Sequence, residues 1–278
     1  MDKTAIKIQA DLAVQAKAIR ASILEMVAAS GSSHIAAAFS IVDILTALYF
    51  AVLRINPQEP KWPERDRFLL SKGHGGAALY ATLASRGFAP LESLAAYAGD
   101  DSAMAGHIVK DSMPGAEVTA GSLGHGLPMA IGRALALKAD GAGTSRVFVL
   151  VGDGECNEGT TWEGALAAAQ FKLDNLVLIV DRNGEQSLGK SDEIMNLEPF
   201  AEKWEAFGWH CLQCDGHDFR QLLAACDLKN KFAGKPTVII ARTQKGKGVS
   251  FMEKDALAWH YKTPKDELLV QARKELDA

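Results

Sequence analysis

The sequence predicts an α/β protein in which a parallel sheet is covered by helices on both faces. From Arg146 onward, short apolar runs alternate with stretches whose apolar residues recur at helical spacing. Parallel strands joined by helices are buried on both faces, which accounts for such continuous apolar runs. The expected strands are residues 147–151, 176–180, 209–213 and 237–241, and the helices between them are residues 157–171, 197–207 and 218–228.

The first half is expected to be helical and rich in loops. Its apolar residues recur at i, i+3 and i+4 in two long stretches, and a proline-containing polar connection follows them. Residues 99–118 show little periodicity, and so long an irregular segment is uncommon unless it has a function. The expected elements here and at the carboxyl end are helices over residues 5–27 and 36–53, a strand over 67–71, a helix after Gly76, a helix ending near Lys138 and a closing helix over 264–276.

Polar residues follow two of the expected strands at the points where these strands end. One apolar run ends at Gly152-Asp153-Gly154, and the next ends at Asp181-Arg182-Asn183-Gly184. The carboxyl ends of parallel strands joined by a helix lie side by side, at the edge where open α/β sheets bind ligands. Asp153 and Asn183 would offer a carboxylate and an amide oxygen there, and Mg²⁺ prefers such ligands while leaving positions for phosphates. The spacing therefore predicts a magnesium and diphosphate site.

Size and charge exclude several classes of protein. The chain has 278 residues, of which 48% are hydrophobic, so it can bury a full core, and we expect one domain over residues 1–278 with a helical region at 1–65. The net charge of −4 and the absence of a basic stripe argue against nucleic-acid binding. No stretch of about 18 uncharged apolar residues occurs, which argues against a membrane span. The amino terminus lacks the apolar core of a signal peptide, so a cytoplasmic location is expected.

Five histidines lie in loops rich in glycine or small residues. A single histidine in such a place is usually structural or solvated, but binding residues concentrate on loops held by a rigid scaffold, so five of them favour a polar pocket. His210 and His217 have ordinary settings at a strand end and a turn. The five are His34, His74, His107, His125 and His260.

Two further groups of residues leave alternatives open. Lys72, Lys245 and Lys247 stand in glycine-rich segments and could be solvated or could recognise an anion. Cys211 and Cys214 could suggest a zinc or redox element. They lie in or beside one short strand without a second such pair, so we assign no metal to them.

Taken together, these segments resemble the thiamine-diphosphate enzymes, and specifically the amino-terminal half of transketolase. The spacing from the Gly-Asp-Gly turn to the asparagine is the family's cofactor fingerprint. The resemblance implies the diphosphate-binding fold of that family, with thiamine diphosphate and Mg²⁺ as cofactors. The other matching segments occur in family order: DRFLLSKGHG (66–75), AGHIVKDSMPG (105–115), GAEVTAGSLGHG (115–126), GWHCLQCDGHD (208–218) and TQKGKGVSFMEKDALAWH (243–260).

The resemblance also implies a role for individual residues. The metal ligands would be the side chains of Asp153 and Asn183 and the backbone carbonyl of Glu185. The residues matched to cofactor contacts are His74, Gly121, Ser122, Leu123, Asp153, Gly154, Glu155, Asn183 and His260. The residues matched to catalytic and sugar-facing positions are His34, His107 and His260. The family commonly has glutamine where His125 stands and often proline where Ser122 stands, so the fine substrate preference is left open.

The implied activity is transfer of a two-carbon ketol group from a ketose or ketose phosphate to an aldose or aldose phosphate, as in pentose phosphate and related carbohydrate metabolism. Full transketolases continue with a pyrimidine-binding domain, and no segment of this sequence resembles that domain. The chain therefore resembles the amino-terminal subunit of a split transketolase. We expect it to form a homodimer within an α2β2 heterotetramer and to need a carboxyl-terminal transketolase subunit as its partner.

Two other functions remain open from the sequence. The chain could serve another thiamine-diphosphate reaction, of the deoxyxylulose-phosphate-synthase or 2-oxo-acid-dehydrogenase type, although the SKGHG and WH segments favour transketolase. It could also be a nucleotide-binding Rossmann protein or a non-catalytic binding module. Against the nucleotide-binding alternative, no GxGxxG segment follows the first strand of a βαβ unit.

Overall fold

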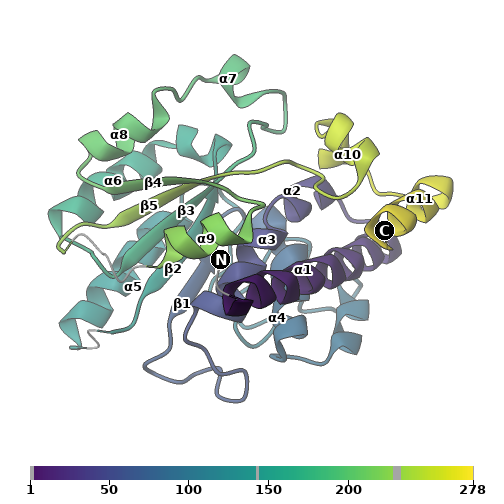
Figure 1. Cartoon of the computed structure of the whole chain (residues 1–278), viewed down its shortest axis with the longest axis horizontal. Helices are drawn as coiled ribbons and strands as arrows, with labels where there is room; N and C mark the ends of the chain where they lie inside the picture. The colour runs from purple at the N-terminus through teal and green to yellow at the C-terminus, as the bar shows by residue number, and fades with distance from the viewer. Residues whose placement is uncertain (1–2, 142–143, 228–232, 278) are drawn as a thin grey trace.

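Five parallel strands form one sheet, as the sequence predicts (Figure 1). The structure is a computed structural model, and it describes residues 3–141, 144–227 and 233–277. The strand order in the sheet is β1-β2-β3-β5-β4. The strands are β1 (Arg67–Leu70), β2 (Val147–Gly152), β3 (Leu176–Arg182), β4 (His210–Asp215) and β5 (Thr237–Arg242). Each expected strand is confirmed to within two residues at either end.

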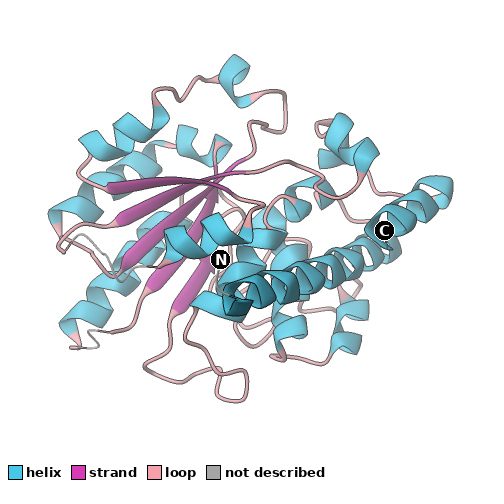
Figure 2. Cartoon of the chain, viewed as in Figure 1, coloured by secondary structure: helices cyan, strands magenta, loops and turns pink. Residues whose placement is uncertain are grey.

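Helices cover both faces of the sheet (Figure 2). Helices α5, α6 and α8 lie on one side, and α9 with the amino-terminal helices lies on the other (Figure 1). The α-helices are α1 (Lys3–Ser30), α2 (Ile35–Phe39), α3 (Val42–Ala47), α4 (Gly76–Arg86), α5 (Gly126–Ala139), α6 (Gly159–Gln170), α7 (Ser191–Ile194), α8 (Phe200–Ala206), α9 (Phe219–Cys226), α10 (Ser250–Lys254) and α11 (Asp266–Asp277). Shorter helical turns are η1 (Leu48–Val52), η2 (Gly73–Gly75), η3 (Leu91–Ala96), η4 (Gly154–Asn157) and η6 (Ala258–His260).

The core lies between the sheet and these helical layers. Strands β2 and β3 are apolar along almost their whole length, and every residue of β2 is buried. Their register pairs Gly152 with Asp181, so the polar residues that follow the two strands emerge at the same edge. The expected side-by-side placement of these strand ends is confirmed.

The predicted single helix over residues 36–53 is wrong in detail. The segment forms α2, α3 and the π-helical turn η1, with a break at Ser40 and Ile41. At the break, the Ser40 hydroxyl bonds to the carbonyl of Ala37 and to the carboxylate of Asp181. A serine that bonds to a neighbouring carbonyl competes with the regular helical pattern, and here it also reaches a buried charge on β3.

Although it contains the charged residue Asp43, this segment is also the one described stretch that is long and apolar enough to cross a membrane. Residues Ile35–Val52 have a mean hydropathy of 2.1, and 83% of the window is buried inside the protein. Because α3 packs against α1 and α4, the segment is accounted for as part of the core.

The irregular stretch expected over residues 99–118 is confirmed, since turns and bends join η3 to α5. The stretch is nevertheless anchored, because Met104, Ile108 and Met113 are buried in the core. It carries His107 towards the carboxyl edge of the sheet, where the backbone N–H of Ile108 donates to the carbonyl of Gly73.

Candidate functional site

A cavity of about 290 Å³ lies at the carboxyl edge of the sheet and gathers most of the predicted site residues. Ser122 and His125 are exposed and lie outside its lining. The His125 ring instead bonds through Nδ1 to the carbonyl of Leu123. The predicted residues that line the cavity are His34, His74, His107, Gly121, Leu123, Asp153, Gly154, Glu155, Asn183, Glu185 and His260.

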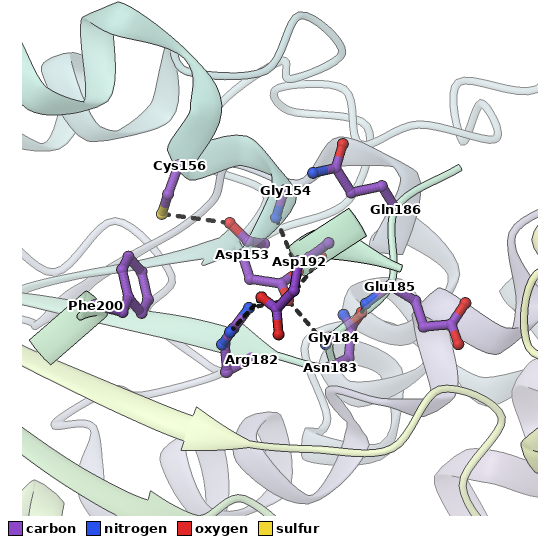
Figure 3. A network of polar contacts seen from close by, with 12 residues as sticks. Asp153, Gly154, Cys156, Arg182, Asn183, Gly184, Glu185, Gln186, Asp192 and Phe200 are labelled. Atoms are coloured by element: carbon purple, nitrogen blue, oxygen red, sulfur yellow. Dashed lines mark hydrogen bonds and ion pairs between the residues drawn. The ribbon is translucent and has the colours of Figure 1, made fainter. Parts of the chain in front are cut away.

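Asp153 is buried at the end of β2 and faces the turn that follows β3 (Figure 3). Its Oδ1 accepts from the Gly154 N–H at 2.8 Å, and its Oδ2 accepts from the Gly184 N–H at 2.8 Å and from Arg182 at 3.2 Å. Burial and the nearby Asp181 carboxylate raise the pKa of Asp153, despite these donors. A buried carboxylate that remains costly to ionise is a favourable place for a bound cation.

Asn183 and Glu185 lie beside Asp153 in the turn after β3. The Asn183 side chain donates through Nδ2 to Asp181 Oδ2 at 2.8 Å, and its Oδ1 accepts from the Glu185 N–H at 3.1 Å. The Glu185 carboxylate points away from Asp153 (Figure 3), while the residue still lines the cavity. The expectation that Glu185 would act through its backbone carbonyl stays a prediction.

A buried ion pair between Lys72 and Asp181 lies next to Asn183 at the strand ends. Lys72 Nζ lies 2.5 Å from Asp181 Oδ2, and both side chains are at most 1% exposed. Burial alone would raise the pKa of Asp181, but Lys72 and the hydroxyls of Thr243 and Ser40 hold it below its ordinary value. Asp181 was not among the site residues predicted from the sequence. The sequence did offer a signal for this pair, because Asp181 directly follows one apolar run and Lys72 directly follows another expected strand.

Lys245 is a second buried cation on the cavity wall. It is 2% exposed, and its Nζ makes a long contact of 3.4 Å with the carbonyl of Gln186. Burial, together with the charge of Lys72, lowers the pKa of Lys245 to about 8. Of the three lysines left open by the sequence, Lys72 and Lys245 therefore line the cavity, whereas Lys247 is partly exposed near Glu253.

Glu155 organises the loop that follows residue 120. Its Oε1 accepts from the Ser71 hydroxyl and from the Gly124 N–H, and its Oε2 accepts from the Gly152 N–H. The Ser71 hydroxyl also accepts from the Gly126 N–H. The Glu155 carboxylate therefore connects the Gly121–Gly126 segment to the ends of β1 and β2. Both of its oxygens already accept hydrogen bonds from the protein itself. Burial raises the pKa of Glu155.

Four histidines gather at the other end of the cavity. The His34 ring lies 4.7 Å from that of His260, 5.4 Å from that of His107 and 5.5 Å from that of His74, centroid to centroid. His34 has a left-handed backbone (φ 71°), and its N–H donates to the carbonyl of His260 at 2.9 Å. A non-glycine residue in this conformation is held by its surroundings and occurs preferentially at functional sites.

These imidazoles are neutral at physiological pH. Burial lowers the pKa of His34 to about 4 and that of His260 to about 3, and nearby cations or histidines act in the same direction. Burial also lowers the pKa of His74 and of His107. The Nδ1 atoms of His34 and His260 are buried and have no hydrogen-bond partner among the described residues. Neutral imidazoles with unused ring nitrogens can donate to or accept from the hydroxyls and carbonyl of a sugar.

The chain is similar over nearly its whole length to one family of enzymes. Residues 12–276 match the family described as transketolase, thiamine diphosphate binding domain. An apulose-4-phosphate transketolase subunit from Actinobacillus succinogenes is 44% identical over 267 residues, which cover 96% of each protein. The 6-deoxy-6-sulfo-D-fructose transketolase subunit SqwG of a Clostridium species is 41% identical over 269 residues, which cover 97% of each protein.

Solved transketolases share the fold over a smaller part of their own length. The Campylobacter jejuni transketolase superposes with a TM-score of 0.87 and 31% identity, covering 96% of this chain and 42% of that one. The Pichia stipitis transketolase in complex with sedoheptulose 7-phosphate gives a TM-score of 0.87 and 30% identity, covering 95% of this chain and 40% of that one.

Proposed function

The chain belongs to the transketolase family, and we propose that it works as the amino-terminal, cofactor-binding subunit of a two-subunit transketolase. Its activity is ketol transfer of the transketolase type, and its cofactors are thiamine diphosphate and Mg²⁺. The Rossmann-type and binding-module alternatives are set aside by this membership. The observation that carries the finer proposal is the cavity, in which Asp153 and Asn183 at one end face four neutral histidines at the other.

The residues present fit a magnesium diphosphate. Among the described residues, no group of three or more His, Cys, Asp or Glu side chains could hold a metal ion by itself. One carboxylate, one amide oxygen and one backbone carbonyl make a sparse oxygen set, which suits Mg²⁺ because this ion takes its remaining ligands from water and phosphate. The buried Asp153 carboxylate, whose pKa is raised, favours a bound cation. The buried ammonium group of Lys245 favours a bound anion.

We assign the metal to the side chains of Asp153 and Asn183 and to the carbonyl of Glu185. Lys245, His74 and the Gly154 region would face the diphosphate. A Cβ at Gly154 would lie 2.8 Å from the Gln186 side chain, so a larger residue at this position would displace Gln186 from the cavity wall. Gly121, Leu123 and the exposed Ser122 would flank the rings, on a loop that Glu155 holds in place.

The histidines would bind and orient the sugar. When bound, thiamine diphosphate supplies the nucleophilic carbon and the electron sink that ketol transfer requires. His34, His107 and His260 would hold the hydroxyls and carbonyl of the ketose and move protons at these oxygens. Their lowered pKa values keep them neutral, so that each can donate at one nitrogen and accept at the other.

A second, different chain is part of the proposal. The relatives that match over 96–97% of their length are named as subunits, whereas the chain covers 40–42% of solved transketolases such as those of Pichia stipitis and Campylobacter jejuni. We propose that residues 1–278 form one diphosphate-binding domain, in which region 1–65 is anchored by the packing of α1 on α4. Two copies would pair and bind two carboxyl-terminal subunits in an α2β2 cytoplasmic enzyme.

The proposed donor is a ketose with an anionic group at its far end. Two relatives are named for apulose 4-phosphate and for 6-deoxy-6-sulfo-D-fructose, which carry a phosphate and a sulfonate. A standard pentose phosphate belongs to the same chemical class, so it remains one of the donors to test.

The proposal is tested by reconstitution. The chain is mixed with a candidate carboxyl-terminal subunit, thiamine diphosphate and Mg²⁺, and transfer from ketose phosphates and sulfonated ketoses to an aldehyde is assayed. We expect transfer only when both subunits and both cofactors are present. A formed complex that binds the cofactor but transfers no ketol group from any of these donors would contradict the proposed function.

A further inference from the structure

Lys245 is placed in the cavity by the loop that carries it. This loop, residues 243–249, connects β5 to α10, and Lys245 stands in its first half. The contact of Lys245 Nζ with the Gln186 carbonyl is long, at 3.4 Å, so the ammonium group does little to fix its own position. The backbone of the loop must therefore set where this cation lies.

His217, in the turn between β4 and α9, holds the residue before Lys245. The backbone N–H of Gln244 donates to His217 Nε2 at 2.8 Å. A backbone N–H can only donate, so Nε2 carries no proton and the ring proton lies on Nδ1. Nδ1 then donates to Asp43 Oδ2 at 2.6 Å. Asp43 thus stabilises the His217 tautomer whose Nε2 can accept a hydrogen bond from the Gln244 N–H.

Asp43, on α3, is itself held by Arg20 of α1. Arg20 donates through both terminal nitrogens to the Asp43 carboxylate, at 2.9 and 2.6 Å, in a bidentate pair. Both side chains are less than 10% exposed. Burial pushes the pKa of Asp43 up, but His217 and Arg20 outweigh it and hold the pKa below its ordinary value, so the carboxylate stays charged.

The same arginine also lies beneath the other end of the loop. A Cβ at Gly248, whose φ is +94°, would lie 3.5 Å from Arg20 Cδ and 3.8 Å from Nε. Between the two ends, the Gly246 N–H donates to the carbonyl of Ala36 at 3.0 Å. The loop is therefore bonded to His217 before Lys245 and to Ala36 after it, and none of Arg20, Asp43 and His217 lines the cavity.

We propose that Arg20, Asp43 and His217 are positioning residues that set Lys245 against the anionic part of the cofactor, through the backbone amide of Gln244. The inference rests on the proposed function in one respect, namely that Lys245 faces the diphosphate. It extends the site to three side chains that touch neither cofactor nor substrate. His217 has an ordinary setting in the sequence, and its role follows from its partners in space.

A double-mutant cycle tests this link. The affinity of the full chain for thiamine diphosphate in excess Mg²⁺ is measured by calorimetry for wild type, His217→Phe, Lys245→Met and the double variant. We expect each single change to weaken binding about tenfold, which is the order expected for losing one charge-assisted contact. The double variant should bind no more weakly than Lys245→Met, since residues that act through one contact are not additive. His210→Phe, the same change at the other end of β4, should leave affinity unchanged.

Three results would overturn the proposal. His217→Phe could bind as tightly as wild type, or Lys245→Met could do so. Alternatively, His217→Phe could weaken binding by the same factor in the Lys245→Met background as in wild type, which would indicate general structural damage.

Amide hydrogen exchange keeps the test independent of folding and of cofactor binding. If His217→Phe does not fold, His217→Gln replaces it, because the glutamine oxygen can accept from the Gln244 N–H without reaching Asp43. In either variant that folds, we expect faster exchange at Gln244 and Gly246, with smaller acceleration in His217→Gln, and no change in His210→Phe. Unchanged exchange at Gln244 in His217→Phe would overturn the link. If wild type binds no thiamine diphosphate, the proposed function fails, and the exchange rates alone decide whether His217 holds the loop.

Discussion

The two ends of the cavity differ in how fully the protein itself uses their polar atoms. At the strand ends, Asp153 accepts from two backbone amides, one guanidinium and the Ser191 hydroxyl, and Asp181 accepts from a lysine, an amide and two hydroxyls. At the opposite end, His34 and His260 each keep a buried Nδ1 without a partner in the described parts of the chain. The strand end is thus organised before any ligand binds, whereas the histidine end has bonds left for a substrate to make.

The same contrast separates two aspartates on neighbouring strands. Asp181 and Asp153 are both buried, but the pKa of Asp181 is lowered mainly by Lys72 against the effect of burial, whereas burial and Asp181 raise that of Asp153. The charge of Asp181 is balanced by the ammonium group of Lys72, whereas the charge of Asp153 is not fully balanced by its partners. Proximity to the site is therefore a poor guide to function, and the partners of each charge distinguish the structural Asp181 from Asp153, the proposed metal ligand.

The largest effect is expected from Asp181→Asn. This change leaves the Lys72 ammonium buried without its counter-ion, and breaking a buried ion pair costs about 3–5 kcal/mol of stability. Denaturant unfolding of the chain without cofactor measures it. Asp192→Asn is the matched control, because Asp192 is 60% exposed and also pairs with a cation, Arg182. A loss as small as that of the control would mean that the pair does not hold the strand ends.

Asp153→Ala should act on ligand binding more than on folding. We expect the affinity for thiamine diphosphate and Mg²⁺ to fall by roughly a hundredfold, because the change removes the only side-chain carboxylate among the proposed metal ligands. Calorimetry measures the affinity, and a melting curve confirms that the chain is folded. Affinity equal to that of wild type would remove the basis for the metal assignment.

His107→Asn should affect turnover of the ketose donor without affecting cofactor affinity. His107 is half-buried and its ring lies beside that of His34, at the end proposed to face the sugar, so the affinity for thiamine diphosphate should stay at the wild-type value. In the reconstituted two-subunit enzyme, kcat/KM for the ketose donor should fall about tenfold, as expected for the loss of one hydrogen bond to the substrate. A parallel fall in cofactor affinity would show that the two ends do not work separately.

The sequence predicts the strand ends and most of the cavity histidines, but it does not predict the buried pairs of charged residues. The edge with Asp153 and Asn183 could be predicted, because apolar runs joined by a helix must end side by side. The gathering of His34, His74, His107 and His260 was predicted from their loop settings, whereas His125, which was expected with them, lies outside the cavity. The buried partners could not be predicted, since Lys72 and Asp181 are 109 residues apart and Asp43 and His217 are 174 apart. Pairings across such separations leave no periodic pattern, and the break at Ser40 has the same origin, because its hydroxyl reaches Asp181 on β3.

The last prediction concerns the pH dependence of stability at the histidine end. The pKa values of His34 and His260 are about 4 and about 3 in the folded chain, below the ordinary 6.5. Below pH 6.5 the unfolded chain takes up protons that the folded chain excludes, so the unfolding free energy decreases as the pH falls from 6.5 towards 4. The aspartates with lowered pKa values, such as Asp43 and Asp66, add to this loss only nearer to and below pH 4, because their ordinary value is 3.8.

In the window from pH 6.5 to about 4.5 the histidines lower the stability as the pH falls, whereas the raised pKa values of Asp153 and Glu155 act in the opposite direction, so the histidine contribution is measured against a variant. Unfolding of the cofactor-free chain in denaturant, repeated across this window, should give a shallower slope for the double variant His34→Gln, His260→Gln than for wild type. Both glutamines keep a polar group in the cavity but cannot take up a proton, so the difference in slope isolates ionisation. An equal slope in the two proteins would mean that these rings are protonated as easily in the folded chain as in the unfolded one, and the contrast between the two ends of the cavity would lose its electrostatic part.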